Sequence, residues 1–122
     1  IMYMLKKYLI FSFILTIIDS IYLYLVGSHF NKVISSVQKS PLKLKPIPTA
    51  ICYFVITLGV FYFAVLKNFS IQDCFLLGLF VYAVYELTNM AILKNWDWFT
   101  VVIDSLWGGI LFSLSVYLFR LF

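Results

Sequence analysis

Apolar residues dominate four long stretches of the chain, and short polar segments separate them. The stretches cover residues 8–26, 49–66, 71–93 and 99–119. An α-helix of about 20 mostly apolar residues crosses a bilayer core about 30 Å thick. Each stretch is too long for a β-strand and lacks the alternating pattern of a membrane barrel strand. The pattern therefore predicts an all-α fold, an integral membrane bundle of four transmembrane helices, in a single domain over residues 1–122.

The segments between the later helices are short and fit this topology. Pro48 suits the first turn of a helix, where its missing N–H has no partner to lose. Ser70 and Asp73 have the spacing of a capping box at a helix start. Residues 94–98 form a tight turn whose two tryptophans suit the level of the lipid headgroups. The last three helices are therefore predicted to pack as consecutive antiparallel neighbours.

The first connection is longer and has a helical pattern of its own. Phe30, Val33, Ile34 and Val37 recur at the spacing of one helical face. This spacing predicts a short interfacial helix between the first and second transmembrane helices. The alternative is a plain lysine-rich loop, because a segment of about three turns is marginal as an isolated helix.

The composition requires a membrane environment. Hydrophobic residues make up 64% of the chain and charged residues 11%, whereas soluble domains have about 45–50% and about 25%. A soluble domain of this size leaves about a third of its unfolded surface exposed, so much of the apolar excess would face water. The chain is therefore expected to be a multi-pass integral membrane protein. Its many Lys, Phe, Tyr and Ile residues are typical of an A/T-rich genome, so a bacterial, viral or organellar inner membrane would fit.

Four spans place both termini at one end of the bundle, here named the terminal end, and the opposite end is named the loop end. The net charge is +4, and the nine lysine and arginine residues divide almost evenly, four at the terminal end and five at the loop end, so the positive-inside rule leaves the orientation open. Because the cations flank the spans, they suit anionic lipid headgroups better than nucleic acid. The expected partners are membrane lipids, and either other membrane subunits or further copies of this chain.

The two cysteines and the single histidine give no sign of cofactor chemistry. Cys52 and Cys74 are expected near opposite ends of the bundle, too far apart to form a disulfide, and are interpreted as apolar packing residues. His29 stands alone, and the chain has no HExxH, Walker or dinucleotide motif. The sequence therefore predicts no metal site and no cofactor. It also contains no evident set of nucleophile and base that would define an enzyme.

Three of the five acidic residues, Asp19, Glu86 and Asp104, lie inside predicted spans. From the rise per residue, each lies about 8–10 Å from the loop end of its helix. Because the helices alternate in direction, the three carboxyl groups fall at one depth. Asn89 follows Glu86 by three residues, and Tyr53 of the second span reaches the same level. This convergence predicts a polar network or a ligand-binding site.

The buried carboxyl groups admit three interpretations. A charged side chain at the bilayer centre costs about 2.5–3.5 kcal/mol, and no lysine or arginine lies within the spans to neutralise it. We therefore expect the carboxyls to share protons or hydrogen bonds, with at least one protonated at neutral pH. They form either a structural network, or a site for a proton, a cation or a polar headgroup, or a catalytic group. The run Ile18-Asp19-Ser20 recurs at residues 103–105, but it is too short to indicate a repeat.

Two motifs connect the chain with a known family. They are Tyr85-Glu86-Leu87-Thr88-Asn89 and, in the fourth span, Asp104-Ser105-Leu106-Trp107-Gly108. With them and Asp19, the chain resembles a family of small four-span membrane proteins, mostly bacterial, known as a domain of unknown function (DUF2177). The resemblance implies a four-helix fold with a polar core and adds Tyr85, Thr88 and Trp107 to the candidate site. Glu86 stands where the family has Asp, and Asn95 where a glycine is usual.

The sequence thus predicts a non-enzymatic integral membrane protein, either an accessory or structural subunit of a membrane complex or a lipid-binding bundle. The alternative is a small proton- or cation-coupled transporter that uses the buried carboxylates. The candidate site residues are Asp19, Tyr53, Tyr85, Glu86, Thr88, Asn89, Asp104 and Trp107.

Overall fold

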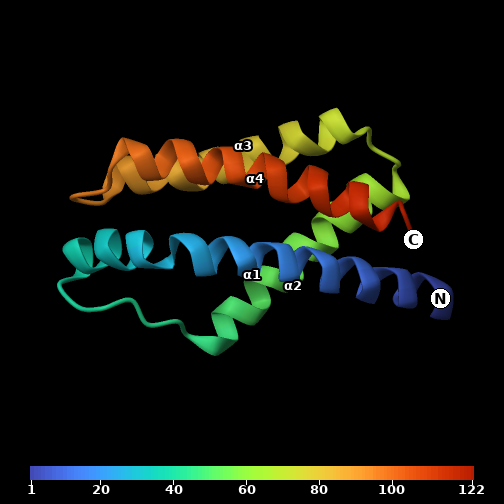
Figure 1. Cartoon of the computed structure of the whole chain (residues 1–122), viewed down its shortest axis with the longest axis horizontal. Coiled ribbons are helices and arrows are strands. Elements are labelled where there is room, and N and C mark those ends of the chain that lie inside the picture. The colour runs from blue at the N-terminus through green and yellow to red at the C-terminus, as the bar shows by residue number, and fades with distance from the viewer.

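The computed structural model describes all residues 1–122 and consists of four long helices without strands (Figure 1). They are α1 (Met2–Gln38), α2 (Pro46–Val60), α3 (Ile71–Ile92) and α4 (Trp98–Phe119), with a π-helical segment, η1 (Phe61–Leu66), continuing α2. Counting α2 and η1 together, each is long and apolar enough to cross a membrane. The all-α, four-span fold is therefore confirmed.

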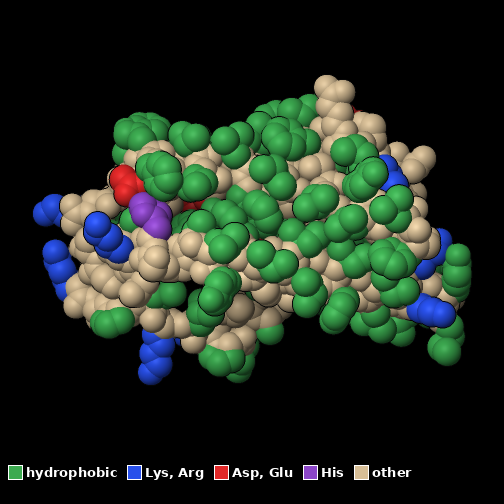
Figure 2. All heavy atoms as spheres, in the orientation of Figure 1, with side chains coloured by type: hydrophobic (Ala, Val, Ile, Leu, Met, Phe, Trp, Pro, Cys, Tyr) green, Lys and Arg blue, Asp and Glu red, His purple; other side chains and the backbone are tan.

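The helices alternate in direction. Figure 1 shows α1 and α3 running one way and α2 and α4 the other, with both chain termini at one end. α3 and α4 are the most closely packed pair, α1 packs on α4, and α2 crosses the bundle obliquely. In Figure 2 apolar side chains cover the middle of the molecule, whereas lysine and arginine side chains gather at its two ends. This distribution suits a bilayer core bounded by two polar surfaces.

The separate interfacial helix is a wrong prediction, and so is the lysine-rich loop over the same residues. α1 continues without a break to Gln38 and ends at Lys39, which adopts a left-handed φ of 63°. The apolar face of this extension packs against the rest of the protein. Its Val33 packs with Trp96 and Val101, which belong to the α3–α4 connection and the start of α4. Tertiary packing therefore stabilises a segment that would be marginal alone.

The helix starts and the last turn follow local rules that the sequence contains. The Ser70 hydroxyl accepts a hydrogen bond from the Asp73 amide at 3.1 Å, as the predicted cap requires. Asp97 caps α4 by accepting from the Thr100 amide at 2.8 Å. Between α3 and α4, Asn95 adopts a φ of 68°, in the left-handed region that favours glycine and tolerates asparagine. Asparagine is therefore accommodated at a turn position that would also suit glycine.

Small residues allow α3 and α4 to approach closely. A methyl group at Gly78 of α3 would overlap the backbone carbonyl of Gly108 on α4. α4 is the most buried helix, and around it lies the main apolar cluster, which includes Phe11, Leu15, Val60, Cys74, Leu111, Phe112 and Val116. Cys74 is thus a packing residue as predicted, while Cys52 is exposed, and the two remain free thiols.

Candidate functional site

The three carboxyl groups predicted to lie inside the bundle do so. Their exposed fractions are 6% for Asp19 on α1, 0% for Glu86 on α3 and 7% for Asp104 on α4. No carboxylate in a low-dielectric interior is stable without hydrogen bonds or an opposite charge. The partners of each carboxyl therefore determine what the site is able to do.

Asp19 is held by two neutral donors from two other helices. The Tyr53 hydroxyl of α2 donates to its Oδ2, and the Trp107 indole of α4 donates to its Oδ1 at 2.9 Å. Both oxygens of this carboxyl are thus satisfied. The contacts connect α1 with α2 and α4 at one point inside the bundle.

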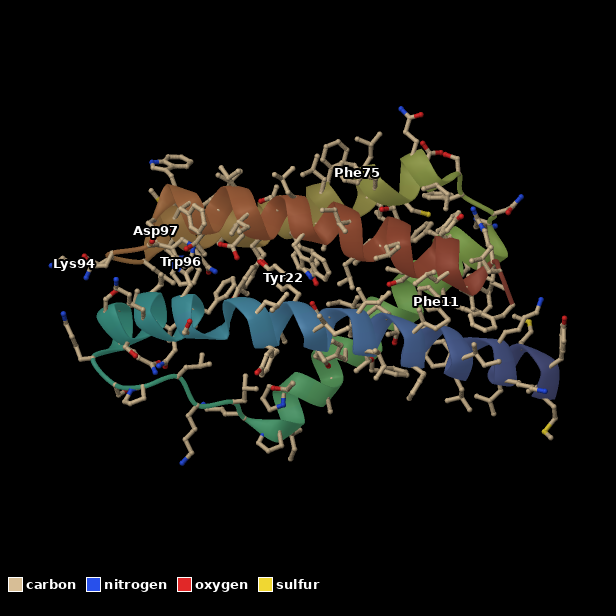
Figure 3. The ribbon with its side chains drawn as sticks, viewed as in Figure 1. Phe11, Tyr22, Phe75, Lys94, Trp96 and Asp97 are labelled. Atoms are coloured by element: carbon tan, nitrogen blue, oxygen red, sulfur yellow. The ribbon has the colours of Figure 1, made fainter.

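Asp104 has a matching partner on α1. The Tyr22 hydroxyl donates to its Oδ1 at 3.2 Å, and the Tyr22 ring stacks on Trp107. In Figure 3 Tyr22 points from α1 toward α4. The hydrogen bond and the stack therefore join the surroundings of Asp104 to those of Asp19.

Glu86 is the carboxyl whose hydrogen bonding is incomplete. Its Oε1 accepts from the Trp96 indole at 2.9 Å, but its Oε2 is buried and has no hydrogen-bond donor. The Glu86 carboxyl lies beside that of Asp104, within direct interaction range. Two carboxylates only accept hydrogen bonds, so this contact is favourable when one of the two carries a proton. The pair is therefore able to share a single proton.

A group of polar contacts lies between the loop end and this pair. Thr100 is completely buried one helical turn before Asp104. Its hydroxyl donates to Asp97 Oδ1 at 2.6 Å and lies 2.8 Å from His29 Nε2. Because the hydroxyl has one hydrogen, His29 Nε2 must be the donor in the second contact. The hydrogen bonds from the Thr100 side chain and amide hold the pKa of Asp97 below its ordinary value.

The sites do not merge into a metal centre. Asp19 contacts its own set of donors, and no three His, Cys, Asp or Glu side chains lie close enough together to hold a metal ion. A hard cation such as Ca²⁺ takes six to eight oxygen ligands. The two paired carboxyls alone offer four oxygens, fewer than such a cation takes.

The family model described as "Predicted membrane protein (DUF2177)" matches residues 4–119. The chain belongs to this family. The match spans all four helices and every carboxyl described above, which confirms the resemblance drawn from the motifs around Glu86 and Asp104. No curated protein and no solved structure is significantly similar to the chain.

Of the three candidate residues that the DUF2177 motifs supplied, one contacts a buried carboxyl and two lie on the outer surface. Trp107 binds Asp19, but Tyr85 is 58% exposed and Thr88 lies on the outer surface, its hydroxyl bonded to the Val84 carbonyl. The structure thus places neither residue among the buried carboxyls, because successive helical residues turn by about 100° and Thr88 therefore faces away from Glu86.

Two further candidates came from helix position and depth rather than from the family. Tyr53 binds Asp19, as the predicted depth suggested. Asn89 shares the face of Glu86 and is partly buried, but no hydrogen bond joins its side chain to a carboxyl. Both side chains thus lie near the network, as their helix positions predict. Only Tyr53 forms a hydrogen bond with a carboxyl group.

Sequence reasoning missed two donors of this DUF2177 site, Tyr22 and Trp96. A signal for the first was present, because Asp19 and Asp104 are both followed by Ser and, three residues on, by an aromatic residue. A spacing of three puts the carboxyl and the ring on the same helical face. The short recurrence set aside as too weak for a repeat therefore marks the two segments that contact each other. Trp96 had no such signal, because its role depends on how the α3–α4 connection folds back.

Proposed function

We propose that this chain is a small, non-enzymatic, proton-coupled membrane transporter in which Glu86 and Asp104 bind the proton. The observation that carries this proposal is the Glu86 Oε2 atom, which is buried without a hydrogen-bond donor, in a carboxyl group that lies beside that of Asp104. Ionisable residues inside membranes are costly and commonly serve proton or ion movement. A purely structural network has no need of an oxygen that lacks a donor.

The pair provides a way to convert proton binding into movement. With one proton the two carboxyls attract each other through a hydrogen bond, and without it two negative charges repel in a low dielectric. The carboxyls belong to α3 and α4, which are closely packed at Gly78 and Gly108. Loss of the proton is therefore expected to loosen this contact. The contacts of Thr100 with Asp97 and His29 favour proton exchange from the loop end.

The proposal can be tested by measuring proton binding directly, because this measurement requires no knowledge of the transported substrate. Purified protein is reconstituted on a solid-supported membrane, and the transient charge movement after a pH jump is recorded. Proton binding inside the bilayer displaces charge, so we expect a current that the double variant Glu86→Gln/Asp104→Asn abolishes. Asp73→Asn is the matched control, because Asp73 is an acidic residue in the first turn of α3, far from the pair. Equal currents in wild type and double variant would contradict the proposal.

Glu86→Gln alone separates loss of the proton from loss of the fold. The glutamine amide donates a hydrogen bond to Asp104 without any proton exchange, so the bundle is expected to keep its stability. Infrared carboxyl bands should respond to pH in the wild type and lose the Glu86 component in the variant. A band that stays protonated across the pH range in which the bundle is folded would instead support a structural pair.

A second candidate function is that of an accessory or structural subunit. It is favoured by Asp19, whose two oxygens are both satisfied by donors from different helices. Such a network fixes the relative positions of helices, a role for which exchange of protons is unnecessary. Native mass spectrometry after gentle detergent extraction tests this role, which predicts bound partner chains and no charge movement after a pH jump.

A further inference from the structure

The loop between α1 and α2 is held in a definite conformation. The Gln38 side-chain amide donates to the Ser40 and Pro41 carbonyls at 3.1 and 2.9 Å. The Leu42 amide donates to Asn31 Oδ1 at 2.8 Å, which fixes the loop against the last turns of α1. Residues 38 and 40–46 surround a hollow of about 720 Å³. The loop is therefore a shaped surface at the loop end of the bundle.

This surface carries positive charge that nothing in the chain neutralises. Lys39, Lys43 and Lys45 are exposed, and Figure 2 shows lysine side chains projecting from the loop end. The one acidic residue outside the spans at this end is Asp97, which is engaged by Thr100. The three lysines thus form a cluster of cations without an acidic partner.

Lysines at the terminal end have contacts that the cluster lacks. The Lys7 ammonium lies 4.5 Å from the centre of the Tyr3 ring, and that of Lys67 lies 5.5 Å from the centre of the Tyr62 ring. Both distances are within the range of cation–π attraction. Lys7 and Lys67 therefore have aromatic partners, which the three loop lysines lack, so the loop lysines are better placed to bind an external anion.

Apolar side chains alternate with the lysines of the loop. Leu42 and Leu44 are 38% and 67% exposed, and Ile47 at the start of α2 is 73% exposed. A water-soluble acidic partner offers no apolar surface on which these side chains could pack. A phospholipid has both an anionic headgroup and acyl chains. We infer that Lys39, Lys43, Lys45, Leu42 and Leu44 form a binding site for the headgroup and upper acyl chains of an anionic phospholipid. The site is independent of the proposed proton transport.

The expected strength follows from the charge. A lysine near an anionic membrane surface contributes about a fivefold gain in affinity, so three together contribute roughly a hundredfold. In the test, the full chain in a neutral detergent is titrated with phosphatidylglycerol or phosphatidylcholine, and retained lipid is measured by native mass spectrometry. We expect preferential retention of phosphatidylglycerol, and a loss of about a hundredfold in its affinity for Lys39→Gln/Lys43→Gln/Lys45→Gln.

The matched control removes the same charge from the other end. Lys6→Gln/Lys7→Gln/Lys67→Gln should retain phosphatidylglycerol at nearly the wild-type affinity. Leu42→Asn/Leu44→Asn should weaken lipid retention while leaving the lysines in place. Equal losses in the two lysine variants, or equal retention of the two lipids by the wild type, would overturn the site. Competition by inorganic phosphate as strong as that by lipid, with no effect of the leucine variant, would assign the lysines to a soluble anion instead.

Discussion

Tyr22 and Trp107 stack face to face, with ring centroids 4.3 Å apart and ring planes 2° apart. Each ring donates a hydrogen bond to the carboxyl three residues before the other: Tyr22 to Asp104, and Trp107 to Asp19. Two antiparallel helices thus present the same carboxyl–aromatic pair to each other. Every group in this arrangement is both a neighbour along its helix and a partner across the bundle, so the four side chains are expected to act together.

The first prediction is that Asp19 and Asp104 are energetically coupled. Asp19→Leu leaves Trp107 and Tyr53 without an acceptor, and Asp104→Leu does the same to Tyr22, so each should destabilise the bundle by about 1 kcal/mol. Because the stacked rings join both sites, the double variant should lose less than the sum of the single variants. Reversible unfolding in mixed detergents measures the three free energies. Strict additivity, as expected for Asp19→Leu with the distant Asp73→Asn, would show that the sites are independent.

The second prediction concerns the closest contact between α3 and α4. Gly78→Ala places a methyl group against the Gly108 carbonyl, so the helices must separate, at a cost of roughly 1–3 kcal/mol. Gly27 and Gly59 are the matched controls, since a methyl group at either meets no atom within 4 Å. Alanine at those two helical positions should be neutral or stabilise by up to about 1 kcal/mol. The same unfolding measurement distinguishes them, and a harmless Gly78→Ala would contradict the packing.

The fold was predictable because a lipid bilayer restricts the secondary structures that can cross it. Long apolar segments that satisfy their own backbone have no alternative to helices, and short connections force antiparallel neighbours. The extent of α1 was not predictable, since the pattern from Phe30 to Val37 is the same for a helix on a membrane and one on a protein. The partner that decides between them, Trp96, lies about 60 residues further along the chain. Only tertiary structure brings the two together.

The candidate site was likewise predictable only in part. The depth of Asp19, Glu86 and Asp104 follows from helix rise alone, and their burial is confirmed. Which face of each helix points into the bundle is harder to predict, because these helices are apolar on every side. Thr88 was therefore placed in the polar core although it faces outward. The pairing of Glu86 with Asp104 depends on the close α3–α4 contact at Gly78 and Gly108, which the sequence alone does not locate.

The third prediction uses the two cysteines as reporters of the up–down topology. Cys74 is completely buried, whereas Cys52 is exposed on the opposite half of the bundle. A membrane-permeant maleimide should therefore modify Cys52 first and reach Cys74 only after unfolding. Mass spectrometry of timed samples gives the order. An intrachain disulfide formed under oxidising conditions would require the two Cα atoms to lie within about 7 Å and would contradict this topology.

The last prediction is a pH dependence that arises at Asp97. Its pKa is held below the ordinary value of 3.8 by hydrogen bonds from Thr100, which favour the charged form in the folded state. A carboxyl with a lowered folded pKa contributes stability at pH values above 3.8, and this contribution is lost as the pH falls through the folded pKa. Wild-type stability should therefore decrease below about pH 4 in part because of this one residue.

Two substitutions at Asp97 isolate its contribution from that of other carboxyls. Asparagine is about as good a helix cap as aspartate, so Asp97→Asn should lose at neutral pH only the attraction of the charge to the helix dipole, about 0.3–1 kcal/mol. Asp97→Ala also loses the cap, about 1 kcal/mol more. The difference in unfolding free energy between wild type and Asp97→Asn should shrink as the pH is lowered from 7 to 3, because protonation removes from the wild type the charge that asparagine lacks. A difference that stays constant over this range would mean that Asp97 is not the group that titrates.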